Sequence, residues 1–410
     1  MAQQGPALAL RDADIICLGP AEWGVINSVT SYTAQGMAQA NRVLYVEPFG
    51  SSLSLRRVAR LQRRQREHKP ELEQIGERFW IYRPPAIGLP GISRLAAVSH
   101  INGWILAWLL RGVQRRLGFR DPILWSPFYN SGTLLKYFPA RLKIFESHDY
   151  DAALARSAAQ QAMILKLEAE TCRAADLVFA VTDELAEPLR VHNPNMHVVH
   201  CAASPEVFGR ALLPETVVPE VIARLPKPVI GYLGGVDPWK IDVGLLHHMA
   251  RSHPEWSIAL VGYVWFGFDA AVFADFPNIH VLGPQDYAAF PGFLKGMDVC
   301  IMPFPLNDTT LRGDALKLDE YLTGGRPVVS TPVPAARRLA SVVRIADSKV
   351  DFVAAVEAAL TDPPQAQAAR LAAVRPHSWE ARNQQKAAII RAALDGSTPV
   401  NPPGRPSPRP

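Results

Sequence analysis

The sequence NDTTLRGDALKLDEYLTGGRPVVST, from Asn307 to Thr331, decides the fold of the second half of the chain. Its polar beginning predicts a loop over residues 307–314, followed by a short helix that carries Lys317 and Glu320. A Gly-Gly pair stops this helix, and the apolar run 327–330 predicts a strand. Because Lys317 and Glu320 are three residues apart, a helix places them on one face.

A helix that begins beside a lysine and a carboxylate suits a nucleoside diphosphate. Free backbone N–H groups at Leu316 and the Lys317 ammonium would bind phosphate oxygens, and Glu320 would accept hydrogen bonds from ribose hydroxyls. This arrangement predicts a site for a sugar nucleotide. The alternative is an ordinary solvent-exposed helix face, which these residues alone do not exclude.

A resemblance to a known family favours the first interpretation. The residues LKLDEYL at 316–322, followed by GGRPVV at 324–329, resemble the donor-site signature of GT-B glycosyltransferases of the group 1, family 4-like type. In that signature a K-L-x-E-Y-L helix precedes G-x-P-V-V. The resemblance implies an α/β fold of two Rossmann-like domains with parallel sheets facing across a cleft. It also implies a C-terminal helix that crosses back to the first domain.

Composition agrees with a two-domain enzyme. The chain has 410 residues, of which 48% are hydrophobic and 20% charged, as in soluble globular proteins. Its four cysteines have no close spacing, so they indicate reduced core residues of a cytoplasmic protein and neither a disulfide framework nor a zinc site. No signal peptide or membrane span is expected, because every apolar run is shorter than the ~20 residues that a span needs. We expect no metal and no cofactor.

The first half of the chain begins as an α/β domain. A strand over 15–18 is followed by a loop with Trp23 and Gly24, a helix to about residue 40 and a strand over 43–46. No G-x-G-x-x-G sequence is present here, which disfavours a dinucleotide dehydrogenase. In the family the loop after the first strand faces the cleft, which implies that Trp23 and Gly24 contact the acceptor or a phosphate. Alternatively, Gly24 only permits a turn.

A His-Asp pair follows another predicted strand, 142–145. Because ligands gather at the carboxyl ends of parallel strands, His148 and Asp149 are placed to take the proton of an acceptor hydroxyl. Loops of the xanthan and teichuronic acid enzymes carry an aspartate here, which implies Asp149 as the base and His148 as the alternative base or a sugar contact. Both residues could instead cap the next helix. The D-x-D of metal-dependent GT-A transferases also occurs at 149–151, but a second α/β series favours GT-B.

Two basic stretches suggest a membrane surface. Arg56–Arg66 contains six arginines and no acid, and Trp104–Arg116 combines two tryptophans with three arginines. Interfacial helices that meet anionic lipids have this composition. A solvated helix face and a core helix remain alternatives. Nucleic acid binding through the arginines would require affinity that falls steeply with salt, and we expect no nucleic acid partner.

The second α/β series begins at Val229. Gly234 and Gly235 follow its first strand and let the backbone approach a ligand, and Lys240 follows within reach of a pyrophosphate. Relatives place a basic residue here for that purpose, which implies that Lys240 binds the donor phosphates. A solvent-facing lysine is the alternative.

The chain departs from the family at one important position. Retaining family 4 enzymes carry E-x7-E, but Arg312 stands eight residues before Glu320. Arg312 would then help to bind the diphosphate or an acidic sugar, and Asp314 could replace the missing acid. The stereochemical outcome, retaining or inverting, stays open.

The predicted organisation has five parts. Residues 1–205 form an acceptor-binding domain, 206–227 a linker, 228–375 a domain that binds the nucleotide sugar, 376–395 a crossing helix and 396–410 a disordered proline-rich tail. The resemblance implies transfer of a sugar from a UDP- or GDP-sugar to a saccharide or a polyprenyl-diphosphate-linked acceptor in surface polysaccharide biosynthesis. The enzyme would be cytoplasmic or peripheral on the inner face of the plasma membrane. The alternative is a catalytically inactive GT-B scaffold at the membrane.

Overall fold

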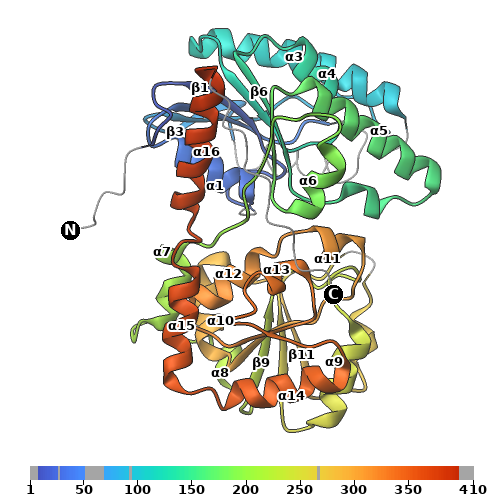
Figure 1. The fold of residues 1–410 in the computed structure, drawn as a ribbon, viewed down its shortest axis with the longest axis vertical. Helices are drawn as coiled ribbons and strands as arrows, with labels where there is room; N and C mark the ends of the chain where they lie inside the picture. The colour runs from blue at the N-terminus through green and yellow to red at the C-terminus, as the bar shows by residue number, and fades with distance from the viewer. Residues whose placement is uncertain (1–7, 26–27, 51–68, 92–94, 266–267, 397–410) are drawn as a thin grey trace. The chain divides into compact units, whose positions relative to one another are not determined.

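The computed structural model describes residues 8–25, 28–50, 69–91, 95–265 and 268–396 (Figure 1). These residues divide into two compact units. The first contains the chain up to His200 and returns from Arg382 onward, and the second contains Cys201–Ala381. The arginine run 56–66 and the tail 397–410 lie outside the described residues.

The first unit is built on a sheet whose described strands have the order β3-β4-β2-β1-β5-β6-β7-β8. All neighbours are parallel except β3 and β4. The strands are β1 (Asp14–Leu18), β2 (Arg42–Val46), β3 (Leu72–Gly76), β4 (Phe79–Tyr82), β5 (Ile123–Ser126), β6 (Leu142–Ser147), β7 (Leu177–Ala180) and β8 (Met196–Val198). The chain continues from β1 to β2 on one side and later to β5 on the other, so the sheet is doubly wound.

Helices of the first unit begin and end where the sequence supplies caps. Ser157 caps α5 and Thr182 caps α6, each by accepting from a backbone N–H, and Gly118 ends α3 at φ 62°. The helices are α1 (Val29–Met37), α3 (Ala96–Leu117), α4 (Gly132–Tyr137), the short 3₁₀ helix η1 (Asp151–Leu154), α5 (Ala158–Ala174), α6 (Asp183–Leu189) and α16 (Trp379–Leu394), which enters the unit at Arg382.

The second unit contains a parallel sheet with the order β11-β10-β9-β12-β13-β14 among the described residues. The strands are β9 (Val229–Leu233), β10 (Ser257–Val261), β11 (Ile279–Gly283), β12 (Val299–Met302), β13 (Val328–Ser330) and β14 (Arg344–Ile345). The helices are α7 (Pro205–Phe208), η2 (Gly209–Leu212), α8 (Glu220–Ala223), α9 (Val243–Ser252), η3 (Ala270–Phe273), η4 (Tyr287–Ala289), α10 (Phe290–Gly296), α11 (Asp308–Arg312), α12 (Leu316–Thr323), α13 (Pro334–Arg337), α14 (Lys349–Leu360) and α15 (Pro364–Val374).

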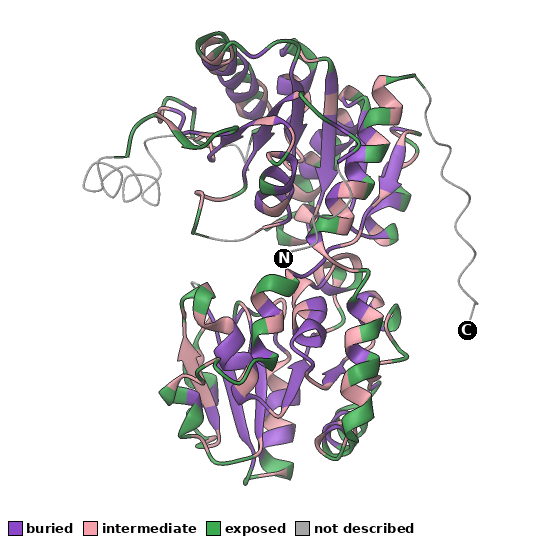
Figure 2. Cartoon of the chain, turned by 90° about the vertical axis from the view of Figure 1, so that its left-hand side faces the viewer, coloured by how far each residue is buried: buried purple, intermediate pink, exposed green. Residues whose placement is uncertain are grey.

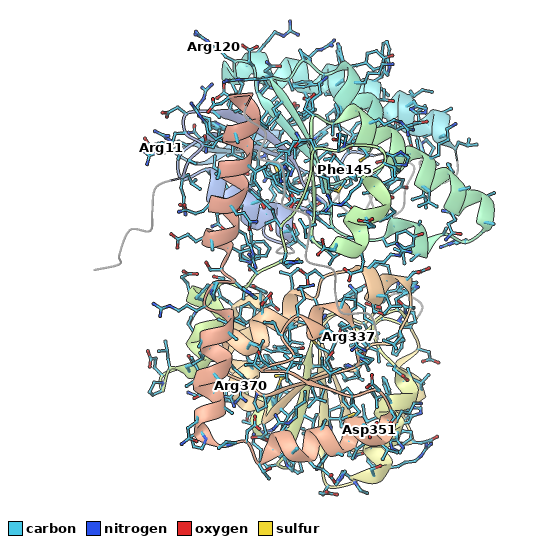
Figure 3. The ribbon with its side chains drawn as sticks, viewed as in Figure 1. Arg11, Arg120, Phe145, Arg337, Asp351 and Arg370 are labelled. Atoms are coloured by element: carbon cyan, nitrogen blue, oxygen red, sulfur yellow. The ribbon has the colours of Figure 1, made fainter. Side chains whose placement is uncertain are left out.

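Each sheet forms the centre of its own core. The central strands are buried while the outer faces of the helices are exposed (Figure 2). Phe145 of β6 lies inside the first unit, whereas Arg120, just after α3, is exposed (Figure 3). Continuous apolar strands such as Ile15–Leu18 are therefore covered on both faces, as parallel sheets require.

Two local predictions differ from the structure. The segment predicted as the loop 307–314 contains the helix α11, because Asn307 and Thr310 form a capping box that starts it. The predicted linker 206–227 belongs to the second unit, since it contains α8 and its Ile222 is fully buried in that core.

Candidate functional site

The second unit holds Lys317 in a setting that suits an anion. The ammonium of Lys317 lies 5.2 Å from the ring centroid of Tyr232 and 5.0 Å from that of Phe304. Among the described residues, no carboxylate lies within 4.0 Å of it and no acceptor bonds to it. Burial first, and then the nearby Lys240, lower the pKa of Lys317 to about 8. An ammonium that has lost water without gaining an acceptor is poised to bind an anion.

Glu320 lies one turn further along α12, as predicted. Burial raises the pKa of Glu320 to about 7, Lys317 opposes this shift, and Asp319 adds to it. The side chain makes no ion pair with any residue that the structure describes. Its carboxyl group is therefore available to accept a hydrogen bond from a ligand hydroxyl.

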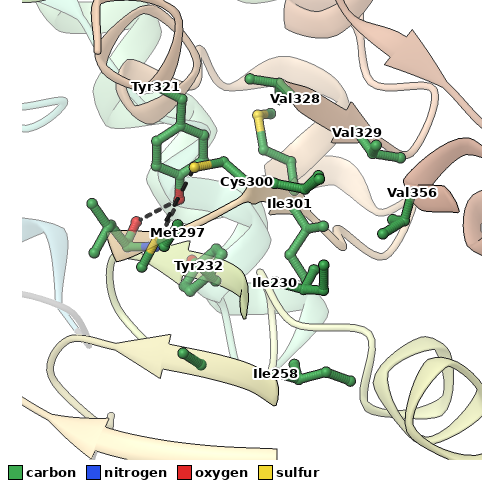
Figure 4. Close-up of a cluster of buried hydrophobic side chains, with 14 of the residues drawn as sticks. Ile230, Tyr232, Ile258, Met297, Cys300, Ile301, Tyr321, Val328, Val329 and Val356 are labelled. Carbon is green, nitrogen blue, oxygen red and sulfur yellow. Dashed lines mark hydrogen bonds between the residues drawn. The ribbon is translucent and has the colours of Figure 1, made fainter. Parts of the chain in front are cut away.

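The position of α12 is fixed by a buried tyrosine. The Tyr321 hydroxyl accepts from Leu233 N at 2.7 Å and donates to Leu233 O at 3.1 Å (Figure 4). This pair ties α12 to the carboxyl end of β9 within the apolar core. The N-cap residue of α12 is Ala315, which makes no side-chain capping bond, so the first N–H groups of α12, beginning at Leu316, are not occupied by a cap.

The glycines predicted to approach a ligand lie beside Lys317. Gly234 has φ 143°, and a Cβ atom there would be 2.9 Å from Lys317 Cε. The backbone of Gly234 also packs against Gly262, where a Cβ would be 2.0 Å from Gly234 O. Gly235 is exposed and its carbonyl accepts from the Tyr232 hydroxyl at 2.9 Å. The structure therefore brings Gly234 and Lys317 together, two residues that are far apart in the sequence.

A buried aspartate, Asp237, holds the backbone of Lys240 close to Lys317 and Gly234. Asp237 accepts from the backbone N–H groups of Trp239 and Lys240 at 3.0 and 2.8 Å. The amide of Asn307 donates to Trp239 O at 3.0 Å, which links this loop to the start of α11. The charge of Lys240 acts on Lys317 and lowers its pKa. Asp237 is a supporting residue that the sequence analysis did not single out.

Arg312 and Asp314 are placed differently from each other. Arg312 is half-buried at the end of α11 and lies 3.7 Å from Asp308. The Asp314 carboxylate, by contrast, accepts from Cys201 N at 2.8 Å and pairs with Arg338 at 2.5 Å, and its side chain is only 2% exposed. These contacts give Asp314 a structural task at the point where the chain enters the second unit.

The predicted acid–base residues follow β6 in the first unit. Asp149 is exposed, and His148 is half-buried with its Nε2 3.4 Å from Glu146 Oε2. Glu146 also contacts Lys386 of α16 at 2.6 Å and accepts from Trp125 Nε1 at 2.8 Å. Burial alone would raise the pKa of Glu146, but Lys386 and then His148 outweigh burial and lower it to about 2. An ionised carboxylate thus faces the imidazole.

Asp151 is a second titratable group at this strand end. Burial, followed by Asp149 and Glu168, raises the pKa of Asp151 to about 7. Its chemistry depends on burial by distant segments, so the sequence does not reveal it. Glu146 could have been noticed as an acid inside an apolar strand, and that signal was missed.

The predicted acceptor residues Trp23 and Gly24 have different surroundings. Trp23 packs edge-on against Tyr45 at 4.9 Å and against Phe79 at 4.6 Å. Gly24 has φ 78° and no atom within 4 Å of an added Cβ, so a turn requires its conformation.

A pocket of about 240 Å³ lies near these residues, at the carboxyl ends of β1 and β2. It occupies the switch point of the sheet, where β1 is flanked by β2 and β5, the usual ligand position in doubly wound folds. Its lining is mainly apolar and includes Leu18, Val46, Phe49, Leu106, Phe128 and Tyr129. These residues were not predicted from the sequence, because they converge only in the tertiary structure.

Two features are absent from the described residues. No group of three or more histidine, cysteine, aspartate or glutamate side chains is arranged to hold a metal ion. Within the same residues, the helices are all too short or too polar to cross a bilayer.

Comparison with known proteins supports the resemblance. No family model matches the sequence. TuaH of Bacillus subtilis (strain 168), whose name describes a glycosyltransferase of teichuronic acid biosynthesis, is 29% identical over 143 residues, which cover 32% of the chain and 34% of TuaH. The similarity thus spans about a third of the length of this curated relative.

Solved structures resemble the chain over nearly its whole length. Sucrose-phosphate synthase from Thermosynechococcus elongatus aligns with a TM-score of 0.69 and 15% identity over 94% of the chain and 100% of that protein. An E. coli trehalose-6-phosphate structure bound with UDP-2-fluoro glucose aligns with a TM-score of 0.67 and 12% identity over 92% of the chain and 99% of that protein. With two parallel-sheet units and this whole-chain likeness, the chain has the GT-B fold of glycosyltransferases, as the sequence predicts.

Proposed function

We propose that the protein is a metal-independent glycosyltransferase of the hexosyltransferase type. It transfers a sugar from a UDP- or GDP-sugar to a saccharide or polyprenyl-diphosphate-linked acceptor in cell-surface polysaccharide biosynthesis. One observation carries the proposal: the half-buried Lys317 ammonium, which has no acceptor among the described residues, lies beside the uncapped start of α12 and the backbone of Gly234. The relative TuaH supports the polysaccharide role by its name.

The proposed chemistry follows from charge. The acceptor hydroxyl attacks the anomeric carbon, the bond from that carbon to the phosphate oxygen breaks, and its electron pair leaves with the nucleoside diphosphate. Lys317, Lys240 and the N–H groups at Leu316 stabilise this negative charge as it develops. Glu320 binds the ribose hydroxyls, Gly234 and Gly235 let the backbone approach the diphosphate, and Arg312 adds positive charge. The contacts of Asp314 support a positioning role in this site.

The proton of the acceptor hydroxyl needs a base from the first unit. We infer that Asp149 is this base, with His148 as the alternative. The geometry adds support for His148, because the Glu146 carboxylate lies 3.4 Å from its Nε2 and can stabilise the imidazolium that forms when the ring takes a proton. Asp149→Asn and His148→Ala distinguish them: the variant that lacks the true base loses at least ~100-fold in kcat. Its pH profile also loses the acidic limb, because a base acts only when it is deprotonated.

The pocket at the switch point supports an acceptor with an apolar part. Its aromatic and aliphatic lining would bind a hydrocarbon or the apolar face of a sugar ring. Trp23 and Gly24 are proposed to border the acceptor at the end of β1.

We also propose that the enzyme works at the inner face of the plasma membrane. The support comes from α3, where Trp104 and Trp108 are 59% and 66% exposed and three arginines follow. Tryptophans in water beside basic side chains suit the interface of a bilayer.

A donor screen tests the proposed activity. Thermal-shift and turnover assays with a panel of UDP- and GDP-sugars should identify one donor that is both bound and consumed, with activity retained in EDTA. Lys317→Ala should reduce kcat/KM by at least ~100-fold, whereas Lys349→Ala, an exposed lysine of the same unit, should have little effect. Binding without turnover that Lys317→Ala leaves unchanged would instead indicate an inactive scaffold, and loss of activity rescued only by a divalent ion would contradict metal independence.

A further inference from the structure

The first unit carries a second pocket that the proposed transfer reaction does not use. This pocket lies between α3, α4 and α5 beside the amino end of β6, where Lys143 is the second strand residue. Its volume is about 610 Å³. Ligands of the transfer reaction are expected at the carboxyl ends of the strands, so the pocket is at the opposite edge of this sheet.

The charge of the pocket is mainly positive. Lys136, Lys143 and Arg173 line it, against the single carboxylate of Glu170. In the part of the chain that the structure describes, neither lysine ammonium has a carboxylate within 4.0 Å, and the Arg173 guanidinium donates to His192 Nδ1 at 3.1 Å. Glu170 itself lies 3.8 Å from His100. The pocket therefore offers cations to an anion such as a phosphate.

Aromatic rings form the rim of the pocket. The centroids of Trp104 and Tyr137 are 5.0 Å apart, and the two side chains are 59% and 44% exposed. Arg111 donates to Tyr137 O at 2.6 Å, which joins α3 to the end of α4. Trp108, one turn after Trp104, is 66% exposed. Such rings are amphipathic and concentrate where water meets lipid.

Trp104 and Trp108 belong to one exposed stripe along α3. Its exposed positions include Ile101, Trp104, Trp108, Arg111 and Arg115, at the three- and four-residue spacing of a single helix face. A solvent-exposed helix face is normally polar. This stripe instead has apolar side chains in its first part and basic side chains in its last part. A soluble anion would account for the basic pocket but would leave the tryptophans in water. A bilayer with anionic headgroups matches both properties.

We propose that this pocket binds the phosphate of an anionic phospholipid headgroup while Trp104 and Trp108 enter the interface between headgroups and acyl chains. The inference rests on the proposed membrane contact of α3 and adds to it a defined headgroup site. It concerns where the protein works and is independent of which sugar is transferred.

Vesicle co-sedimentation of the full chain tests the proposal. Binding to vesicles of phosphatidylcholine with one quarter phosphatidylglycerol should be at least tenfold tighter than to phosphatidylcholine alone. Trp104→Ala with Trp108→Ala should weaken binding to both vesicles, and Lys136→Gln with Lys143→Gln should remove most of the preference for phosphatidylglycerol. Arg11→Gln with Arg190→Gln removes the same charge from elsewhere in this unit and should preserve that preference.

Several results would overturn the headgroup site. These are equal binding to both vesicles, an equal loss of preference in the control pair, or occupation of the pocket by glycerol phosphate in solution with no vesicle binding. Capture of a protein partner by the tryptophan stripe without vesicle binding would do the same. Circular dichroism melts verify that each variant folds. Donor-induced thermal shifts, measured on the same samples without lipid, show separately whether the proposed transfer function fails.

Discussion

Lys317 is the residue on which the proposed donor site depends most. Its ammonium is surrounded by two aromatic rings and a glycine backbone, so its charge is maintained at a cost in desolvation. A bound diphosphate would offset that cost. The same features make the site sensitive to pH, because a pKa near 8 lies within the range of ordinary assays.

The affinity for UDP or GDP should therefore fall as pH rises through about 8. The anion binds the protonated form of Lys317, which predominates below its pKa of about 8 and is lost above it. Lys240→Met removes the neighbouring positive charge, so it should move the inflection to higher pH even though it also weakens binding. Isothermal titration between pH 6.5 and 9.5 measures both effects. A pH dependence that survives in Lys317→Met would show that another group titrates.

Gly234 provides a steric test of the same site. Gly234→Ala adds a Cβ 2.9 Å from Lys317 Cε at φ 143°, so it should destabilise the second unit by about 1–3 kcal/mol and displace the lysine. Gly235→Ala, where the nearest atom would be 3.5 Å away, should cost far less stability. Denaturant unfolding measures the difference. Equal stability of the two variants would mean that the backbone at Gly234 adjusts without strain.

At the scale of elements, α16 is attached to the first unit by a buried ion pair. Lys386 and Glu146 are both 1% exposed and 2.6 Å apart, and Lys386 also donates to Thr33 at 3.0 Å. Neither partner alone is stable in this environment. The pair therefore requires α16 to stay in place on the sheet, and it explains a lysine within an otherwise apolar contact.

Lys386→Met should destabilise the first unit by about 3–5 kcal/mol, because it leaves Glu146 buried without its partner. Adding Glu146→Gln should recover part of this loss. In the wild type the pKa of Glu146 is lowered to about 2, so its contribution to stability is present above the unfolded pKa near 4.5 and is lost as pH falls toward 2. Urea unfolding at pH 7, 4 and 3 measures the free energy of unfolding of the wild type, the single variant and the double variant. If the free energy of unfolding of the double variant fell with pH as much as that of the wild type, the role of Glu146 would be contradicted.

At the scale of the whole molecule, the two chain segments that connect the units lie side by side in the second unit. Ala203 bridges to Ser378, and Ala203 N donates to His377 O at 3.2 Å. Both segments also contact residues beside the donor site: Asp314, just before α12, accepts from Cys201 N, and Asp319 within α12 contacts His377 Nδ1 at 2.9 Å. A ligand on α12 can thus affect both connections.

Donor-site ligands should therefore slow amide exchange beyond α12 itself. Saturating UDP or GDP, whichever binds, should protect residues 201–203 and 377–379 as well as 316–320 in hydrogen–deuterium exchange. Asp319→Ala should reduce the distant protection around His377 while α12 stays protected. Protection confined to α12 in the wild type would show that the connections do not respond to the ligand.

The sequence by itself determined buried strands such as 15–18, 43–46 and 142–145, the helix with Lys317 and Glu320, and the fold class. These depend on local signals: apolar runs long enough for buried parallel strands, caps such as Thr182, and a stop at Gly324-Gly325. The short helix α11 was not predicted, because the residues of its capping box at Asn307 are equally common in turns. The segment 206–227 was wrongly predicted to be a linker, because only tertiary packing makes Ile222 a core residue.

Only the tertiary structure decided what the site residues can do. It placed Lys317 against Gly234, assigned Asp314 to Arg338 and the Cys201 backbone, and buried Glu146 beside Lys386. Each of these facts depends on contacts between segments far apart in the chain. The charge state, the burial and the partner of a side chain follow from such contacts. Desolvation and Coulomb interactions depend on distances in space, and these distances leave no periodic pattern in the sequence.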